Sequence, residues 1–241
     1  MPVAVAQDAD YKMVLEEVIV TAQKREQDLQ DVPISVVVIS GEQINNANLV
    51  TIEDLQSYVP NLYVTDSQLG PKLHIRGIGS GINQGFEQSM GVYVDGVYFG
   101  RAQQSRMVMM DTERVEVLRG PQSILFGKNS IAGALNISTA QPTDTPKARM
   151  TALYGWDIKE KLFDGFLSGP IGDSFAGRIA AHARDTDGYM YNLTLNRDEP
   201  ARKERLVRGI LEWSPSDSTQ ITLKVESGSF ACTASFEIKF R

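Results

Sequence analysis

Apolar and polar residues follow two different patterns along the chain, and the change comes near Pro142. Before it, short apolar runs alternate with polar turns and with stripes of helical spacing, a mixture typical of a compact α+β unit. After it, apolar and polar residues alternate with period two, as in strands that have one apolar and one polar face. The pattern therefore predicts a leader segment over residues 1–31, an α+β domain over residues 32–142 and antiparallel strands over residues 143–241.

Within the α+β domain, capping-box patterns predict helices that begin at Ser40 and at Thr51. In this pattern, the side chains at the helix start and three residues later bond each other's backbone amides. The second helix carries an apolar stripe and ends at Pro60. Asp95-Gly96 predicts a tight hairpin turn, because both positions tolerate a positive φ. Strands are expected at residues 34–39, 62–65, 73–76, 91–97, 114–118 and 134–139.

The period-two part has the alternation of transmembrane barrel strands, with apolar side chains outward and polar side chains inward. A soluble sheet with one wet face would show the same alternation. Connection lengths favour the barrel, since tight turns at 169–173 and 214–218 flank a long polar loop at 185–202. About five or six strands fit into this part, whereas bacterial single-chain barrels need at least ~8. We therefore expect an incomplete transmembrane β-barrel, and a chain that is an N-terminal fragment.

Composition narrows the possible functions. The net charge of −6 and the pI near 5.1 argue against a nucleic-acid partner. No run of 18 consecutive apolar residues occurs in the sequence, so a membrane-spanning helix is not expected. The single cysteine, Cys232, can form neither an internal disulfide nor a thiolate metal cluster.

We find no catalytic constellation, metal site or cofactor site in the sequence. His74 and His182 are far apart and lack ligands at metal-site spacing. The glycine-rich stretches near Gly77 and Gly120 do not have the spacing of nucleotide-binding loops, so these glycines are expected in turns and close-packed positions. Four charged residues are expected to form ion pairs or a solvated face: Arg76, Arg114, Glu116 and Arg119.

Four motifs, in this order, resemble the TonB-dependent outer-membrane receptors. Residues 15–22 (LEEVIVTA) look like the TonB box of that family. Residues 73–79 (LHIRGIG), 92–101 (VYVDGVYFGR) and 113–142 (ERVEVLRGPQSILFGKNSIAGALNISTAQP) resemble its plug domain. The resemblance assigns the contact with TonB to Glu16, Glu17, Val18, Ile19, Val20, Thr21 and Ala22. It assigns the plug motif to Arg76, Gly77, Asp95, Gly96, Arg114, Glu116, Arg119, Gly120, Pro121, Gly127 and Gly133.

The resemblance implies a receptor of the bacterial outer membrane that is not an enzyme. Its partners would be TonB with the inner-membrane energising complex, outer-membrane lipid and a small-molecule ligand, foremost an iron–siderophore complex or another metal chelate. Val18 to Thr21 would add as a strand to a sheet edge of TonB; an edge strand packed on its own domain is the alternative. In the family, charged plug residues face the inner barrel wall. The other candidate function is that of a soluble periplasmic plug-like binding module.

Overall fold

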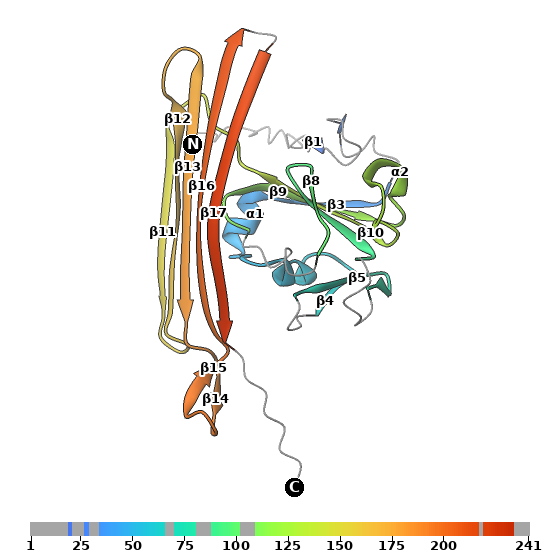
Figure 1. Ribbon diagram of the computed structural model, residues 1–241, viewed down its shortest axis with the longest axis vertical. Helices are drawn as coiled ribbons and strands as arrows, with labels where there is room; N and C mark the ends of the chain where they lie inside the picture. The colour runs from blue at the N-terminus through green and yellow to red at the C-terminus, as the bar shows by residue number, and fades with distance from the viewer. Residues whose placement is uncertain are drawn as a thin grey trace, which may run out of the picture.

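The computed structural model describes residues 19–20, 27–28, 34–65, 70–80, 88–101, 109–216 and 219–233. Two parts stand side by side in Figure 1. A compact α+β part, which we call the plug, packs against one face of a tall antiparallel sheet, which we call the wall. The expected combination of an α+β plug with antiparallel strands of an unclosed barrel is confirmed.

The plug contains a five-stranded sheet in the order β3-β9-β10-β7-β8, in which only β10 and β7 are parallel. A three-stranded sheet, β4-β5-β6, lies beside it. The strands are β3 (Val36–Ser40), β4 (Leu62–Thr65), β5 (Lys72–Ile75), β6 (Ile78–Gly79), β7 (Met90–Val94), β8 (Val97–Phe99), β9 (Thr112–Arg119) and β10 (Gly133–Thr139). The helices are α1 (Gly41–Asn46), η2 (Ile52–Ser57) and α2 (Ser123–Phe126).

Local side-chain chemistry sets the starts of the first two helices. Ser40 Oγ accepts from the Gln43 amide at 3.2 Å, and Gln43 Oε1 accepts from the Ser40 amide at 3.1 Å, so the expected capping box is present. Asp54 Oδ2 accepts from the Thr51 amide at 2.8 Å, as its pattern predicts. The second helix is nevertheless a short 3₁₀ helix rather than an α-helix. No helix among the described residues is long and apolar enough to cross a membrane.

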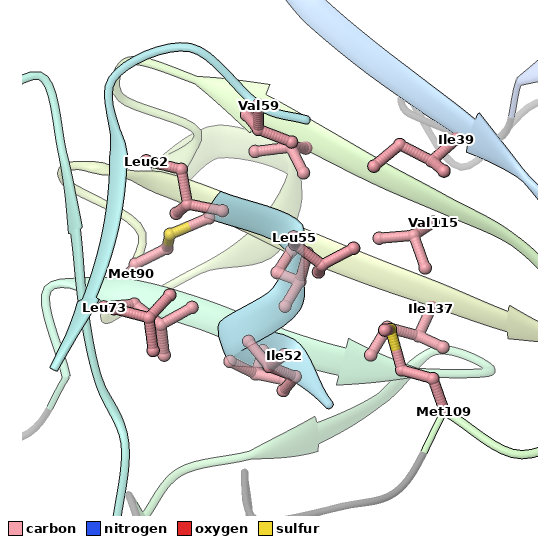
Figure 2. Close-up of a cluster of buried hydrophobic side chains, with 14 of the residues drawn as sticks. Ile39, Ile52, Leu55, Val59, Leu62, Leu73, Met90, Met109, Val115 and Ile137 are labelled. Carbon is pink, nitrogen blue, oxygen red and sulfur yellow. The ribbon is translucent and has the colours of Figure 1, made fainter. Parts of the chain in front are cut away.

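The core of the plug lies between η2 and the sheets. Ile52 and Leu55 of η2 are fully buried, as are Leu73 of β5 and Val115 of β9. Figure 2 shows the side chains of η2 among those of the surrounding strands. The apolar stripe that the sequence predicts therefore lies on η2, and its side chains pack between the two sheets of the plug.

Backbone geometry explains the residues at two places in the plug motifs, the Asp95-Gly96 turn and Gly133. Asp95 and Gly96 have φ values of 46° and 79° and connect β7 to β8, which confirms the predicted hairpin. At Gly133, a Cβ atom would lie 2.3 Å from the carbonyl oxygen of Leu118. A side chain at this position would push β9 and β10 apart, so glycine is needed there.

The wall is a five-stranded antiparallel sheet in the order β11-β12-β13-β16-β17. Its strands are β11 (Lys147–Gly155), β12 (Glu160–Pro170), β13 (Phe175–Thr186), β16 (Ala201–Ser216) and β17 (Thr219–Thr233). The stretch 185–202, expected as a long loop, contains a hairpin of β14 (Met190–Asn192) and β15 (Arg197–Glu199). The predicted turn at 214–218 is shorter than expected, because β16 continues to Ser216.

The two faces of the wall differ in polarity, as the alternation predicts. Leu167, Ile179 and Val225 are 54–62% exposed on the face away from the plug. Arg178 and Arg208 point toward the plug and are buried. At the end of the wall that carries the β12–β13 turn, Phe175 stacks on Trp213 with ring centres 5.9 Å apart. At the other end, Tyr154 meets Trp156 edge-on at 4.9 Å.

The buried position of η2 leads to a test of the plug core. Ile52→Ala should destabilise the plug by about 2–5 kcal/mol, because it removes a fully buried side chain and leaves a cavity. Ile124 of α2 is 99% exposed, so Ile124→Ala should change stability by less than about 0.5 kcal/mol. Hydrogen exchange of the β9 and β10 amides in the two variants measures the difference. Equal effects would contradict the assignment of η2 to the core.

Two short strands near the N-terminus pair with each other and, among the described residues, with no strand of the plug sheets. β1 (Ile19–Val20) pairs antiparallel with β2 (Gln27–Asp28), with Ile19 opposite Asp28 and Val20 opposite Gln27. The other expected TonB-box residues lie outside the described residues: Glu16, Glu17, Val18, Thr21 and Ala22.

Candidate functional site: the contact between plug and wall

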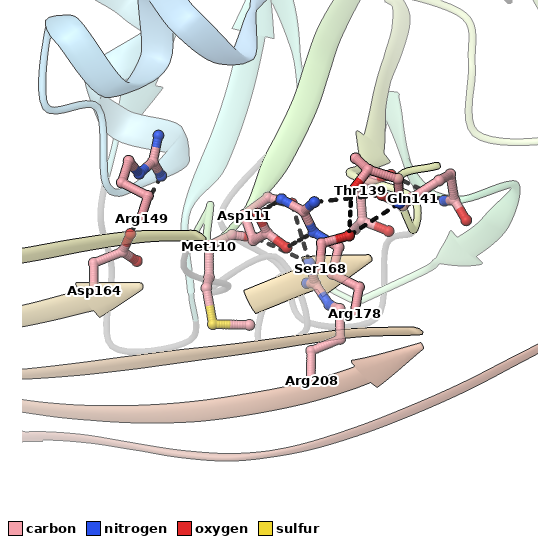
Figure 3. Close-up of polar contacts among 10 residues, drawn as sticks. Met110, Asp111, Thr139, Gln141, Arg149, Asp164, Ser168, Arg178 and Arg208 are labelled. Carbon is pink, nitrogen blue, oxygen red and sulfur yellow. Dashed lines mark hydrogen bonds and ion pairs between the residues drawn. The ribbon is translucent and has the colours of Figure 1, made fainter. Parts of the chain in front are cut away.

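A buried ion pair joins the plug to the wall immediately before β9. Arg178 of β13 donates from Nε to Asp111 Oδ2 at 2.6 Å and from Nη2 to Asp111 Oδ1 at 2.5 Å. Both side chains are 6% exposed. The planar guanidinium matches both carboxylate oxygens at once, which makes this two-bond geometry stronger and more directional than a single contact. Figure 3 shows the pair between the plug and the wall.

Arg178 is also supported from within the wall. Its guanidinium carbon lies 3.9 Å from the ring centre of Phe166 on β12, a cation–π contact. Its Nη1 donates to the carbonyl oxygen of Gln141 at 3.4 Å, where the chain passes from plug to wall. The position of this side chain therefore does not depend on Asp111 alone.

A second arginine reaches the same plug segment from the next strand. Arg208 of β16 donates from Nη1 to the carbonyl oxygens of Met110 at 2.9 Å and Asp111 at 3.4 Å. Its Nε donates to Glu226 Oε2 on β17 at 2.7 Å, and its side chain is 3% exposed. Two wall arginines thus hold one short plug segment, residues 110–111, by its backbone and by its carboxylate.

A second ion pair ties the turn of the plug hairpin to the last wall strand. Lys224 of β17 bonds Asp95 Oδ2. Asp95 also accepts from the Thr139 amide and from the Thr139 hydroxyl, each at 2.8 Å. The side chains of Lys224 and Asp95 are each 27% exposed, so water screens this pair more than the Arg178 pair.

The surroundings of Asp95 determine its charge. Burial alone would raise the pKa of Asp95, but hydrogen bonds from Lys224 and Thr139 and the charge of Lys224 outweigh burial and hold the pKa below its ordinary value of 3.8. A carboxyl group with a lowered pKa stabilises the folded state above its ordinary pKa, and this contribution is lost as the pH falls through the lowered value. Asp95 is therefore ionised at neutral pH, as its pairing with Lys224 requires.

A polar cavity of about 240 Å³ lies between the loop after α1 and the wall. Its wall side includes Arg149, Asp164 and His182. His182 Nδ1 lies 3.3 Å from Asp164 Oδ2, and Nε2 lies 3.7 Å from a carboxylate oxygen of the buried Glu204. Within the described part of the chain, no group of three or more His, Cys, Asp or Glu side chains is arranged to hold a metal ion.

The plug-motif residues chosen from the sequence occupy several different places. Arg114 Nε donates to Glu116 Oε1 at 2.9 Å, and the side-chain Nδ2 of Asn136 donates to Glu116 Oε2 at 3.2 Å, which holds a fully buried carboxylate inside the plug. Arg76 reaches the hydroxyl of Ser35 at 3.4 Å. Four glycines of the motif have φ between 75° and 89° and lie in the connections between elements: Gly77, Gly96, Gly120 and Gly127. Gly133, with φ 157°, is the first residue of β10. Gly120 and Pro121 form the turn after β9, and Arg119 ends that strand.

Of that set, the structure brings Asp95 into contact with the wall. Sequence reasoning missed Asp111 and its wall partners Arg178 and Arg208. The two arginines alternate with apolar residues on their strands, so the polar face was visible in the sequence. The pairing was not visible, because Asp111 and Arg178 are 67 positions apart.

Comparisons with known proteins find relatives of this chain and solved structures with the same fold. A family model described as the TonB-dependent Receptor Plug Domain matches residues 28–134. The ferric-pyoverdine M114 receptor PbuA of Pseudomonas sp. (strain M114) is 31% identical over 214 residues, which are 85% of this chain and 24% of that protein. The vitamin B12 transporter BtuB of Photobacterium profundum is 28% identical over 171 residues, 71% of this chain and 28% of that protein.

A solved structure shares the fold. The ferric yersiniabactin uptake receptor FyuA from Yersinia pestis matches with a TM-score of 0.74 at 26% identity, over 81% of this chain and 31% of that one. The chain thus spans about a quarter to a third of the length of these relatives, which are named as receptors and transporters rather than enzymes. The matched plug domain, the relatives and the shared fold together show that this chain belongs to the TonB-dependent receptors.

Proposed function

We propose that this chain is the plug and part of the barrel wall of a bacterial outer-membrane receptor that imports an iron–siderophore complex with energy from TonB. The observation that carries the proposal is the seating of the plug on the polar face of a wall whose other face is apolar. A plug in this position would close a transmembrane barrel, and cargo would pass only after the plug shifts.

The contacts of the plug with the wall suit such a shift. Asp111 is held by a buried pair, whereas Asp95 is held by a partly exposed one. Thr143 and Ser168 add neutral hydrogen bonds of 2.9–3.0 Å where the chain enters the wall. Polar contacts of this kind can be exchanged for water or for other partners during movement, whereas an interdigitated apolar interface would expose apolar area.

The substrate class rests on the relatives. Two of the three relatives described above are named for ferric pyoverdine and ferric yersiniabactin, and the third is named for vitamin B12. An iron–siderophore complex is therefore the first proposal for the ligand, and a cobalt-containing corrinoid is the second. The proposal includes no catalytic residue, no resident metal and no cofactor.

The outward face of the wall argues against a soluble periplasmic module. Leu223 and Val225 on β17 are 60% and 62% exposed, and Leu211 and Trp213 on β16 are also exposed. A run of exposed apolar side chains on one sheet face is costly in water and favourable in lipid. We therefore propose outer-membrane lipid as the partner of this face.

We propose that the chain divides into a leader and TonB-box segment (residues 1–31), the plug (residues 32–142) and the wall (residues 143–241). We also propose that the segment that includes β1 binds TonB. The two-residue pairing of β1 with β2 supports an extended backbone there. An isolated two-stranded pair is only marginally stable in water, so TonB could replace β2 or add to the free edge of β1. The TonB-binding residues would be those of the TonB box, and the plug-motif residues would shape the plug that TonB moves.

The role of β1 can be tested by uptake. In a chimaera in which this chain replaces the matched part of FyuA, Val20→Pro should abolish uptake of ferric yersiniabactin without changing its binding at the cell surface. Proline removes a backbone N–H donor and disfavours strand addition. Val20→Ala keeps the donor and should keep uptake. If Val20→Pro transports as well as Val20→Ala, the segment does not act through strand pairing.

The lipid-facing assignment predicts different effects of the same charge on the two faces of β17. Val225 faces outward opposite Gly209, whereas Thr222 belongs to the alternating set that points inward with Lys224. An arginine deep in a lipid-facing position costs about 2–4 kcal/mol. In the same chimaera, Val225→Arg should lower the yield of heat-modifiable folded barrel far more than Thr222→Arg. Similar yields for both would favour a soluble sheet.

A further inference from the structure

Arg178 and Arg208 together have the composition of an anion-binding site. Both guanidinium groups come from adjacent wall strands and converge on residues 110–111. The Asp111 carboxylate takes two hydrogen bonds from Arg178, and the nearby carbonyl oxygens of Met110 and Asp111 take bonds from Arg208. Asp111 therefore occupies the place that the carboxylate of a bound ligand would take in an arginine-built site.

The two arginines have supports that belong to the wall. Phe166 lies under the guanidinium of Arg178, and Glu226 holds Nε of Arg208. Neither support comes from the plug. Withdrawal of Asp111 would therefore leave both guanidinium groups oriented as they are now, and a preorganised site loses less entropy when it binds an anion.

The charge balance also favours an anion. With Asp111 in place, the two arginines face the carboxylates of Asp111 and Glu226. When Asp111 leaves, Glu226 remains beside Arg208, whereas the contacts that Arg178 keeps among the described residues, to the ring of Phe166 and to the carbonyl of Gln141, are neutral. Arg178 is 6% exposed while Asp111 covers it. When Asp111 withdraws, the guanidinium loses its carboxylate, and the oxyanion of a cargo molecule can take up the same two hydrogen bonds.

We propose that Arg178 and Arg208 form an oxyanion-binding site in the wall, that Asp111 is its resident anion, and that a carboxylate- or other oxyanion-bearing cargo takes the place of Asp111 as the plug shifts. The use of this site by cargo rests on the proposed function in uptake. The exchange of Asp111 for a free anion does not rest on the proposed function, because this exchange can be measured on the chain without transport. Cargo that carries such groups would be selected over neutral cargo.

The experiment supplies acetate to the full chain in detergent micelles after the resident carboxylate has been removed. Asp111→Ala should lower the melting temperature, and acetate should restore it along a saturable curve, while chloride at the same ionic strength should not. The parent chain should not respond, because Asp111 already occupies the site. Asp111→Ala/Arg178→Gln should lose the acetate response, because it lacks the guanidinium that binds both oxygens.

Asp95→Ala is the matched control. It also removes a plug carboxylate that pairs with the wall, but its partner is the more exposed Lys224 rather than an arginine pair. Restoration by acetate in Asp111→Ala alone supports the site. An equal acetate response in Asp95→Ala or in the double variant, or no response in Asp111→Ala, overturns it.

A second readout covers the case in which Asp111→Ala does not fold. Asp111→Gly removes the carboxylate, leaves its place open and suits the positive φ of 50° at this position. In this variant, the Nε–H resonance of Arg178, assigned by its loss in Arg178→Gln, should shift with acetate and saturate. A resonance that does not move with acetate overturns the site, whatever the transport activity of the receptor.

Discussion

The buried pair of Asp111 and Arg178 is the constraint on which the arrangement of plug and wall depends. A guanidinium buried on a sheet face is unfavourable unless a carboxylate meets it with good geometry. The pair meets this condition through two hydrogen bonds of 2.5 and 2.6 Å. Arg208 adds bonds to the adjacent carbonyl groups, so one plug segment is fixed in position, orientation and depth against β13 and β16.

The polarity of the two wall faces is consistent with the position of the plug that Asp111 and Arg178 fix. The inner face of the wall presents polar side chains that need partners, and its outer face presents exposed apolar side chains, for which we propose lipid as the partner. The plug supplies the partners on the inner side, at Asp111 and, more weakly, at Asp95. Neither part would be well satisfied in water without the other, which explains why a period-two sheet and a compact α+β unit occur together in one chain.

Local features could be predicted from the sequence because neighbouring residues determine them. The capping box of Ser40 and Gln43 and the turn at Asp95-Gly96 depend on residues within a few positions of each other. The alternation after Pro142 predicted both faces of the wall. The apolar stripe of η2 could not distinguish a 3₁₀ helix from an α-helix, because both place every third or fourth residue on one face.

Long-range pairings were beyond the reach of the same reasoning. Arg114 and Glu116, two of the ion-pair candidates, pair with each other two positions apart, and Glu116 is fully buried rather than on a solvated face. The sequence gives no sign that Arg208 would reach the carbonyl of Met110 across 98 positions. The cavity beside His182 was missed for the same reason, because its lining combines the loop after α1 with three wall strands. Tertiary packing, not local preference, creates these contacts.

The measurement that tests this account most directly is a pair of double-mutant cycles. Hydrogen exchange of the β9 amides measures the free energy of plug opening in each variant. One cycle combines Asp111→Ala with Arg178→Ala, and the other combines Asp95→Ala with Lys224→Ala. The account predicts a coupling of about 2–3 kcal/mol for the buried Asp111–Arg178 pair and of less than about 1 kcal/mol for the more exposed Asp95–Lys224 pair. Equal couplings, or a larger coupling for Asp95 and Lys224, would contradict the claim that Asp111 fixes the plug to the wall.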